Sequence, residues 1–261
     1  MTMLRSAAFA IAFYVATALF LVLGSPLLLA PRSWAMAGLR AHARTALWLL
    51  RLIAGIRIEV RGRDNLPDGA CLVAAKHQSA WDTFALIPLF RDPAIVLKAE
   101  LASIPFYGWF CRKFEHILVR RDRAAAALKA MISDAKMKAA AGRQILIFPE
   151  GTRQAPGAEP DYKPGVVALY EGLSLPCVPL ALNSGLYWPR RRLPRYPGTI
   201  VVEILEALPA GLGRAQFRAE LQRRIEDASD SLIREAASSR SPPLIDPAVL
   251  ARVGANAAQQ A

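Results

Sequence analysis

From residue 56 to residue 237, short apolar runs alternate with longer stretches of helical composition. The apolar runs indicate strands at residues 56–61, 70–75, 94–97, 116–119, 144–148, 178–183 and 199–205. Helical composition is found at residues 79–89, 123–141, 166–172 and 215–237. Strands that alternate with helices build a layered α/β architecture. We therefore expect an α/β domain over residues 55–237, with a central, mostly mixed β-sheet flanked by helices.

The front of the chain is its most apolar part. No residue from Ser6 to Pro31 is charged, and a helix that crosses a bilayer needs about 20 such residues. Gly24-Ser25-Pro26 interrupts the run, because proline cannot continue the helical hydrogen bonds. Residues 34–56 are apolar with interspersed arginines, which is typical of an interfacial amphipathic helix. We expect membrane-associated helices over residues 1–54, which either span the bilayer or form a hairpin dipped into one leaflet. A signal peptide is less favoured, because the apolar run is too long.

The chain length, the C-terminal segment and the cysteines lead to three further expectations. The length of 261 residues suits one large domain with a small appendage. Residues 238–261 are polar, alanine-rich and interrupted by proline, and we expect a loose C-terminal tail. Cys71, Cys111 and Cys177 are far apart, without the spacing of a metal site or a disulfide framework. A reducing, cytosolic environment fits this pattern.

The charge is strongly positive and lies near the apolar front. The formal net charge is +12, with many arginines before Asp64 and a further block at residues 190–195. Arginines beside an apolar segment favour the cytoplasmic face and anionic headgroups. We therefore expect the inner (cytoplasmic) membrane, with the α/β domain on the cytoplasmic side. Nucleic acid is not an expected partner, since zinc spacing, aromatic-basic stacking and helix-turn-helix signals are absent from the sequence.

His77 and Asp82 are the first candidates for chemistry. On one continuous helix they would lie about 140° apart, so they can meet only if His77 precedes the helix. Ser79 is a candidate N-cap, with Asp82 at the third helical position. The carboxylate would then fix the imidazole tautomer and leave the other ring nitrogen as a base. The alternative is that Asp82 is only a capping residue.

A second candidate site follows the strand at residues 144–148. Phe148-Pro149-Glu150-Gly151-Thr152-Arg153 forms a sharp turn at the sheet edge where ligands of open α/β sheets bind. Gly151 permits close backbone approach, and Arg153 offers a fork that suits phosphate. Arg120 and Arg121 also follow a strand, and Lys163 is a further positive candidate. The alternative is a surface turn in which Arg153 pairs with Glu150.

Other common catalytic and nucleotide-binding motifs are missing from the sequence, and the segments around the two remaining histidines suggest no chemistry. The sequence contains neither a G-x-S-x-G elbow nor a P-loop nor a dinucleotide fingerprint. His42 lies in the amphipathic segment and His116 enters a strand, so we expect both to be structural.

Four motifs in order give the chain a family resemblance over about residues 55–210. They are His77-x4-Asp82, Lys98…Gly108 leading to Ile117-Leu118-Val119-Arg120-Arg121, Phe148–Arg153, and Leu175-Pro176-Cys177-Val178-Pro179. This pattern resembles the glycerolipid acyltransferases, and most of all the 1-acylglycerol-3-phosphate (lysophosphatidate) acyltransferases of bacteria. The resemblance implies the glycerol-3-phosphate acyltransferase-like fold.

The resemblance also implies roles for individual residues. His77 would be the general base and Asp82 its orienting partner. The implied substrate-binding residues are Arg120, Arg121, Glu150, Gly151, Thr152 and Arg153, with the arginines on the acceptor's phosphate. Lys76 departs from the pattern, because asparagine commonly precedes this histidine. A lysine there would either weaken His77 as a base or contact an anionic donor.

The implied reaction moves an acyl chain from acyl-coenzyme A or acyl-acyl carrier protein to the sn-2 hydroxyl of lysophosphatidate. It implies no metal, no other cofactor and no acyl-enzyme intermediate. Expected partners are membrane lipids, lysophosphatidate and the acyl donor. Two alternatives stay open from the residues alone: another lysolipid acceptor, such as a lyso-ornithine lipid, and a non-catalytic membrane lipid-binding protein.

Overall fold

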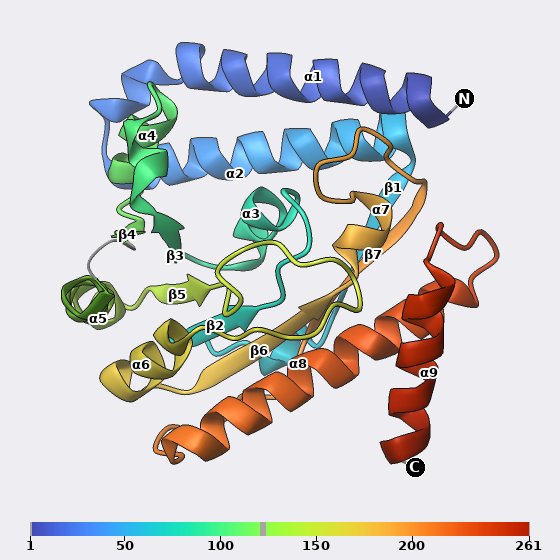
Figure 1. Ribbon diagram of the computed structural model, residues 1–261. Helices are drawn as coiled ribbons and strands as arrows, with labels where there is room; N and C mark the ends of the chain where they lie inside the picture. Colours follow the sequence, from blue (N-terminus) through green and yellow to red (C-terminus); the bar gives the residue numbers. More distant parts are fainter. Residues whose placement is uncertain (1, 121–123, 261) are drawn as a thin grey trace.

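A seven-stranded sheet forms the centre of the computed structural model, which describes residues 2–120 and 124–260 (Figure 1). The strands are β1 (Ile56–Arg61), β2 (Leu72–Ala75), β3 (Pro93–Lys98), β4 (Ile117–Val119), β5 (Gln144–Ile147), β6 (Cys177–Leu182) and β7 (Gly198–Ile204). Their spatial order is β1-β7-β6-β2-β5-β3-β4. Neighbouring strands are parallel except β6 and β7, which are antiparallel. The expected mixed sheet is confirmed.

Helices cover both faces of this sheet (Figure 1). Beyond the N-terminal pair described below, the α-helices are α3 (Asp82–Ala85), α4 (Tyr107–Lys113), α5 (Ala124–Ala140), α6 (Pro164–Leu173), α7 (Ser184–Tyr187), α8 (Arg214–Ala237) and α9 (Pro247–Gln260). Short 3-10 turns occur at Arg63–Asn65, Ile87–Leu89 and Ala99–Ser103. The central strands β2, β5 and β6 are buried along their whole length. Strands covered on both faces become continuous apolar runs, which explains their composition.

The side chains of β2 alternate between two separate apolar cores. Val73 and Ala75 belong to the core beneath the N-terminal helices, which also contains Trp81 and Phe84. Leu72 and Ala74 belong to the other core, which is formed with α5, α6 and α8. This alternation is the two-residue period of a strand. The same alternation determines which face of the sheet each side chain just after β2 is directed to.

The apolar front forms a helical hairpin. The helices α1 (Thr2–Leu23) and α2 (Arg32–Leu49) lie side by side (Figure 1), joined through a 3-10 turn at Ser25–Leu28. A π-helical turn, Leu50–Ala54, continues α2 to the start of β1. By length and composition, α1 is apolar enough to cross a membrane. The expected break at Gly24-Ser25-Pro26 is confirmed, since α1 ends at Leu23 and the 3-10 turn follows.

Contacts fasten the hairpin to the α/β part. Phe9 is buried in the core beneath the hairpin, where its ring meets Trp188 at 5.3 Å. Arg32 forms a bidentate ion pair with Asp92 at 2.8 and 2.6 Å, just before β3. The hairpin and the sheet therefore share one core. The division into domains at residues 54 and 237 stays a prediction.

The expectation of a loose tail is wrong for residues 247–260, which form α9. Pro247 occupies the first helical turn, where its missing N–H costs nothing. Asp246 caps this helix, because its carboxylate accepts the Ala248 N–H at 2.9 Å. Val253 is fully buried, and its carbonyl accepts from Arg234 of α8 at 3.0 Å. Of the prolines that interrupt this segment, Pro247 opens a helix and does not break one.

His116 should make the fold sensitive to mild acid. Burial, reinforced by nearby Arg143, lowers the pKa of His116 to about 3, against about 6.5 in an unfolded chain. The stability that neutral His116 contributes to the folded state is therefore fully present above pH 6.5 and is lost as the pH falls toward 3. From pH 7 to pH 5 the free energy of unfolding should drop by roughly 2 kcal/mol on this account.

Denaturant unfolding of the wild type and His116→Gln at both pH values measures this loss. Glutamine keeps an acceptor for the Ile95 N–H, which lies 3.3 Å from His116 Nδ1. Between pH 7 and pH 5, the free energy of unfolding of the variant should fall by about 2 kcal/mol less than that of the wild type. An equal loss in both proteins would contradict the assignment.

Candidate functional site

The imidazole of His77 and the carboxylate of Asp82 are in contact. The ladder continues one residue past β2, where the Lys76 N–H donates to Leu180 at 2.9 Å. His77 follows, and its Nδ1 lies 2.9 Å from Oδ2 of Asp82, the first residue of α3. Ser79 accepts the Trp81 N–H at 3.2 Å and donates its own N–H to Asp82 at 2.8 Å. Asp82 thus caps the turn and holds the histidine at once, so the two interpretations of this residue are compatible.

The Asp82 carboxylate is completely buried and acts as an acceptor. Oδ2 accepts from His77 Nδ1, Gln78 N–H and Ser79 N–H, and Oδ1 accepts from Ser184 Oγ at 2.6 Å. An ionised carboxylate has no proton to donate. In neutral His77 the proton therefore lies on Nδ1, which leaves Nε2 free to accept a proton. This is the arrangement of a general base with an orienting partner.

The turn after β5 lies directly beside His77. Phe148 stacks on the imidazole with ring centroids 4.1 Å apart, which restrains the ring. Gly151 has φ +63°, a left-handed conformation that favours glycine. The Gln154 N–H then donates to the His77 carbonyl at 2.8 Å. The two candidate sites predicted from the sequence are therefore one site.

Arg153 and Thr152 belong to this turn and are half-buried. The Arg153 carbonyl accepts from Arg190 at 2.7 Å, which brings a second arginine to the turn. Glu150 is fully buried and pairs with Lys76, so the surface-turn alternative, an Arg153–Glu150 pair, is wrong.

The other predicted cations are placed differently. Arg120 is exposed and follows β4, at the same sheet edge as His77 but three strands from β2. With about 4.8 Å between strands, that separation is roughly 14 Å along the edge. Arg121 lies outside the described residues. Lys163 is exposed and pairs with Asp161, so the geometry does not join it to the site.

Lys76 does not face a substrate, contrary to expectation. Its side chain is 1% exposed, and Nζ lies 2.7 Å from Glu150 and 2.8 Å from Glu226 of α8. Lys76 has the strand parity of Leu72 and Ala74, so its side chain enters the core beneath α8 and not the face of His77. Contact of this ammonium with an anionic donor is excluded by its burial between two carboxylates.

Sequence reasoning missed Ser184 and Gln78, which complete the site's framework. Ser184 opens α7 just after β6 and donates to Asp82. The Gln78 side chain accepts the Gly185 N–H at 3.0 Å. No motif marks Ser184, although its place at the end of a parallel strand puts it at the ligand-binding edge.

An apolar cavity of about 280 Å³ lies under the hairpin, next to the site. Thr83 and Phe84, which directly follow Asp82, line one side of it. Most of the rest is apolar, with Phe13 and Leu39 from the hairpin and Phe110 from α4, although His42 and His116 also line it. Its volume approaches the lower end of the range for ligand pockets. Thr83 and Phe84 therefore connect the cavity wall to Asp82 through the start of α3.

Fold and site together define a class. A mixed α/β sheet carries at one edge a buried His–Asp pair, an adjoining glycine turn with arginines, and an apolar cavity. Such a site suits an enzyme that activates a hydroxyl group of an amphipathic substrate.

Comparison with known proteins identifies the family. Residues 57–183 match the family described as Acyltransferase. The chain is 41% identical over 183 residues to a 1-acyl-sn-glycerol-3-phosphate acyltransferase of Pseudomonas aeruginosa, covering 70% of this chain and 71% of that protein. Identity to 1-acyl-sn-glycerol-3-phosphate acyltransferase alpha of Mus musculus is 29% over 205 residues, with coverages of 76% and 70%. The chain belongs to the acyltransferase family, as its motifs predict.

A solved structure shares the fold. The crystal structure of the 1-acyl-sn-glycerophosphate acyltransferase of Thermotoga maritima superposes with a TM-score of 0.75 at 22% identity. The match covers 89% of this chain and 98% of that one. The expected fold class is thereby confirmed.

Ser184→Ala should weaken the site without dismantling it. The variant removes one hydrogen bond to a buried charge, worth about 1.5–3 kcal/mol. We expect kcat to fall about tenfold, far less than the roughly 10⁴-fold loss from mutating an orienting carboxylate itself. Steady-state kinetics measures this, with Ser231→Ala, an exposed serine of α8, as the matched control. Wild-type kcat in Ser184→Ala would show that Asp82 does not need this donor.

Proposed function

We propose that this protein transfers an acyl chain from an acyl thioester to the sn-2 hydroxyl of 1-acylglycerol-3-phosphate, giving phosphatidate. The observation that carries the proposal is the His77–Asp82 contact beside the Gly151–Arg153 turn. The relatives named above, which act on this acceptor by their names, support the choice of substrate.

The reaction follows from the tautomer of His77. Nε2 takes the proton of the acceptor hydroxyl as its oxygen attacks the thioester carbonyl. The new C–O bond forms, the C–S bond breaks, and the proton passes from the imidazolium to the departing sulfur. Asp82 stabilises the imidazolium throughout, because its buried carboxylate faces Nδ1. This scheme uses no metal or other cofactor.

The acceptor's phosphate would be bound by the arginines near the turn. Arg153 directly precedes Gln154, whose N–H donates to the His77 carbonyl, and Arg190 donates to the Arg153 carbonyl. Arg120 lies farther from His77 along the same sheet edge. It would contact a part of the substrate that is more distant from the reacting hydroxyl group. A guanidinium binds phosphate through paired hydrogen bonds.

The apolar cavity would hold part of an acyl chain. Its lining comes from the hairpin and from residues adjacent to Asp82, so an inserted chain passes close to the reacting groups. The donor is acyl-coenzyme A or acyl-acyl carrier protein, both of which are anionic and suit the chain's positive charge. Other lysolipids are the alternative acceptors.

We place the enzyme at the cytoplasmic side of the inner membrane. The outward face of α1 exposes Ile11, Tyr14 and Val15, and α2 exposes Trp34 and Trp48. Exposed apolar and aromatic side chains flanked by arginines suit the interface of an anionic leaflet. Lysophosphatidate and phosphatidate are lipids, so the enzyme meets both at this surface.

His77→Ala should abolish turnover while the fold persists. A positioned general base contributes about 10²–10⁴-fold, so thiol release from acyl-coenzyme A with lysophosphatidate should fall by that factor. The assay uses purified protein in detergent, with circular dichroism as the check of folding. Near-normal turnover in the variant would end the assignment of His77 as base.

Arg153→Ala should act on the acceptor. Loss of a charge-assisted hydrogen bond of about 1.5–3 kcal/mol should raise KM for lysophosphatidate roughly 10- to 100-fold, with little change for the donor. Arg223→Ala, an exposed arginine of α8, is the matched control. If only the KM for the acyl donor changed, Arg153 would bind the donor and the proposed contact with the acceptor would be wrong.

A further inference from the structure

A buried charge cluster lies behind the site, on the opposite face of the sheet. Lys76 Nζ is held at 2.7 Å by Glu150 Oε1 and at 2.8 Å by both oxygens of Glu226. Tyr162 donates to Glu226 at 2.9 Å. The Lys76 and Glu150 side chains are 1% and 0% exposed. Such a cluster is costly to bury, so its geometry matters.

The cluster reaches the catalytic histidine through the second oxygen of Glu150. Oε2 accepts the His77 backbone N–H at 3.1 Å, while Oε1 faces Lys76. A continuous series of contacts therefore runs from Glu226 of α8 through Lys76 and Glu150 to His77. Glu150 also begins the turn that carries Gly151 and Arg153. One carboxylate thus adjoins both halves of the site.

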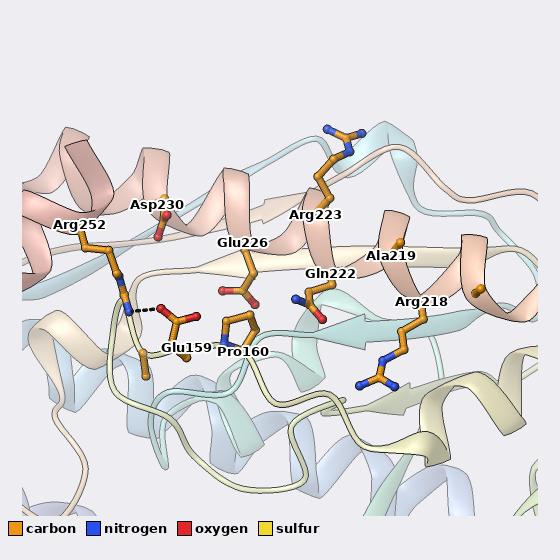
Figure 2. Close-up of a pocket in the computed structure, with 11 residues that line it drawn as sticks. Glu159, Pro160, Arg218, Ala219, Gln222, Arg223, Glu226, Asp230 and Arg252 are labelled. Carbon is orange, nitrogen blue, oxygen red and sulfur yellow. Dashed lines mark hydrogen bonds and ion pairs between the residues drawn. The ribbon is translucent and has the colours of Figure 1, made fainter. Parts of the chain in front are cut away.

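The far end of this series lies at the surface. Glu226 lines a groove of about 610 Å³ between α8 and residues 158–160, where it projects from α8 toward Pro160 (Figure 2). Its side chain is 19% exposed, and burial raises the pKa of its carboxyl group. Arg252 and Glu159, which also line the groove, pair with one another at 3.3 Å.

The charges explain why a lysine is placed here. Glu150 and Glu226 contribute two carboxylates, and Lys76 lies between them with hydrogen bonds to both. Without the ammonium the two carboxylates would repel, and Glu150 would lose the partner of Oε1. Lys76 is therefore one of the two contacts, with the His77 N–H, that orient this carboxylate.

We propose that Lys76 is a positioning residue for this reaction: its ammonium clamps Glu150, and Glu150 in turn fixes the backbone of His77. The proposal rests on the function proposed above for His77. Glu226 and Tyr162 hold the ammonium in place, so α8 takes part in shaping the site from the far side of the sheet.

Lys76→Met tests the clamp with an unbranched, uncharged chain. We expect kcat per folded molecule to fall at least about tenfold, with both KM values within about twofold of wild type. A lysine that only supports the fold would lower the melting temperature and leave kcat per folded molecule unchanged. That second result would overturn the proposal.

Lys76→Met/Glu226→Gln separates charge balance from positioning. It keeps the cluster's formal charge at the wild-type value, since one cation and one anion disappear together. Thermal stability should recover relative to Lys76→Met, while kcat stays at least about tenfold below wild type. Recovery of kcat along with stability would overturn the proposal. Glu235→Gln, on the exposed part of α8, is the matched control.

Amide hydrogen exchange tests the same clamp without relying on turnover. In the wild type the His77 amide should exchange within about tenfold of the rate at Val73 in β2. In the double variant His77 should exchange faster by about tenfold or more, with Val73 unchanged. A rapidly exchanging His77 in the wild type would overturn the proposal even if the variants do not fold.

Failure of the clamp and failure of the proposed function are distinguishable. A wild-type protein that releases no thiol with any lysolipid refutes the function, while the exchange rates still decide whether Lys76 clamps Glu150.

Discussion

The buried carboxylate of Asp82 is the interaction on which the site depends. A carboxylate that is buried away from water is tolerated only when hydrogen bonds from the protein replace those it would make to water. Three of its donors come from the segment His77–Ser79 and one from Ser184, which opens α7 just after β6. Each bond to a charged group contributes about 1.5–3 kcal/mol. The same contacts start α3, orient the imidazole and join the ends of two adjacent strands.

The two-residue period of β2 separates chemistry from support. His77 has the parity of Val73 and Ala75 and faces the core beneath the hairpin, where Phe148 of the same face stacks on its ring. Lys76 has the opposite parity and faces α8. Neighbouring residues therefore enter different environments, one partly open to substrate and one buried among carboxylates. A lysine beside His77 is compatible with the proposed role of His77 as a base, because the side chain of Lys76 lies on the other side of the sheet.

Local features were predictable from the sequence, and distant pairings were not. Apolar runs marked the strands because central strands of a covered sheet are apolar throughout. The His77–Asp82 contact followed from cap chemistry within a few residues. Ser184 and Glu226 are more than a hundred positions from their partners, Asp82 and Lys76, and no spacing rule links them. The orientation of Lys76 is different, since strand parity alone could have placed it opposite His77.

The hairpin's contacts argue for a helix pair that lies along the membrane. Phe9 is 1% exposed against Trp188, and the Phe13 ring meets Phe84 at 5.4 Å, in the helix that Asp82 begins. If α1 crossed the bilayer away from the α/β part, Trp188 and Phe84 would lose their aromatic partners on α1 and be left facing water. The crossing would also open the apolar cavity, which Phe13 helps to line. A docked hairpin keeps both the contacts and the cavity wall, and its exposed outer face is free to enter one leaflet. The helices whose outer face is exposed are then the same pair that walls the apolar cavity beside α3.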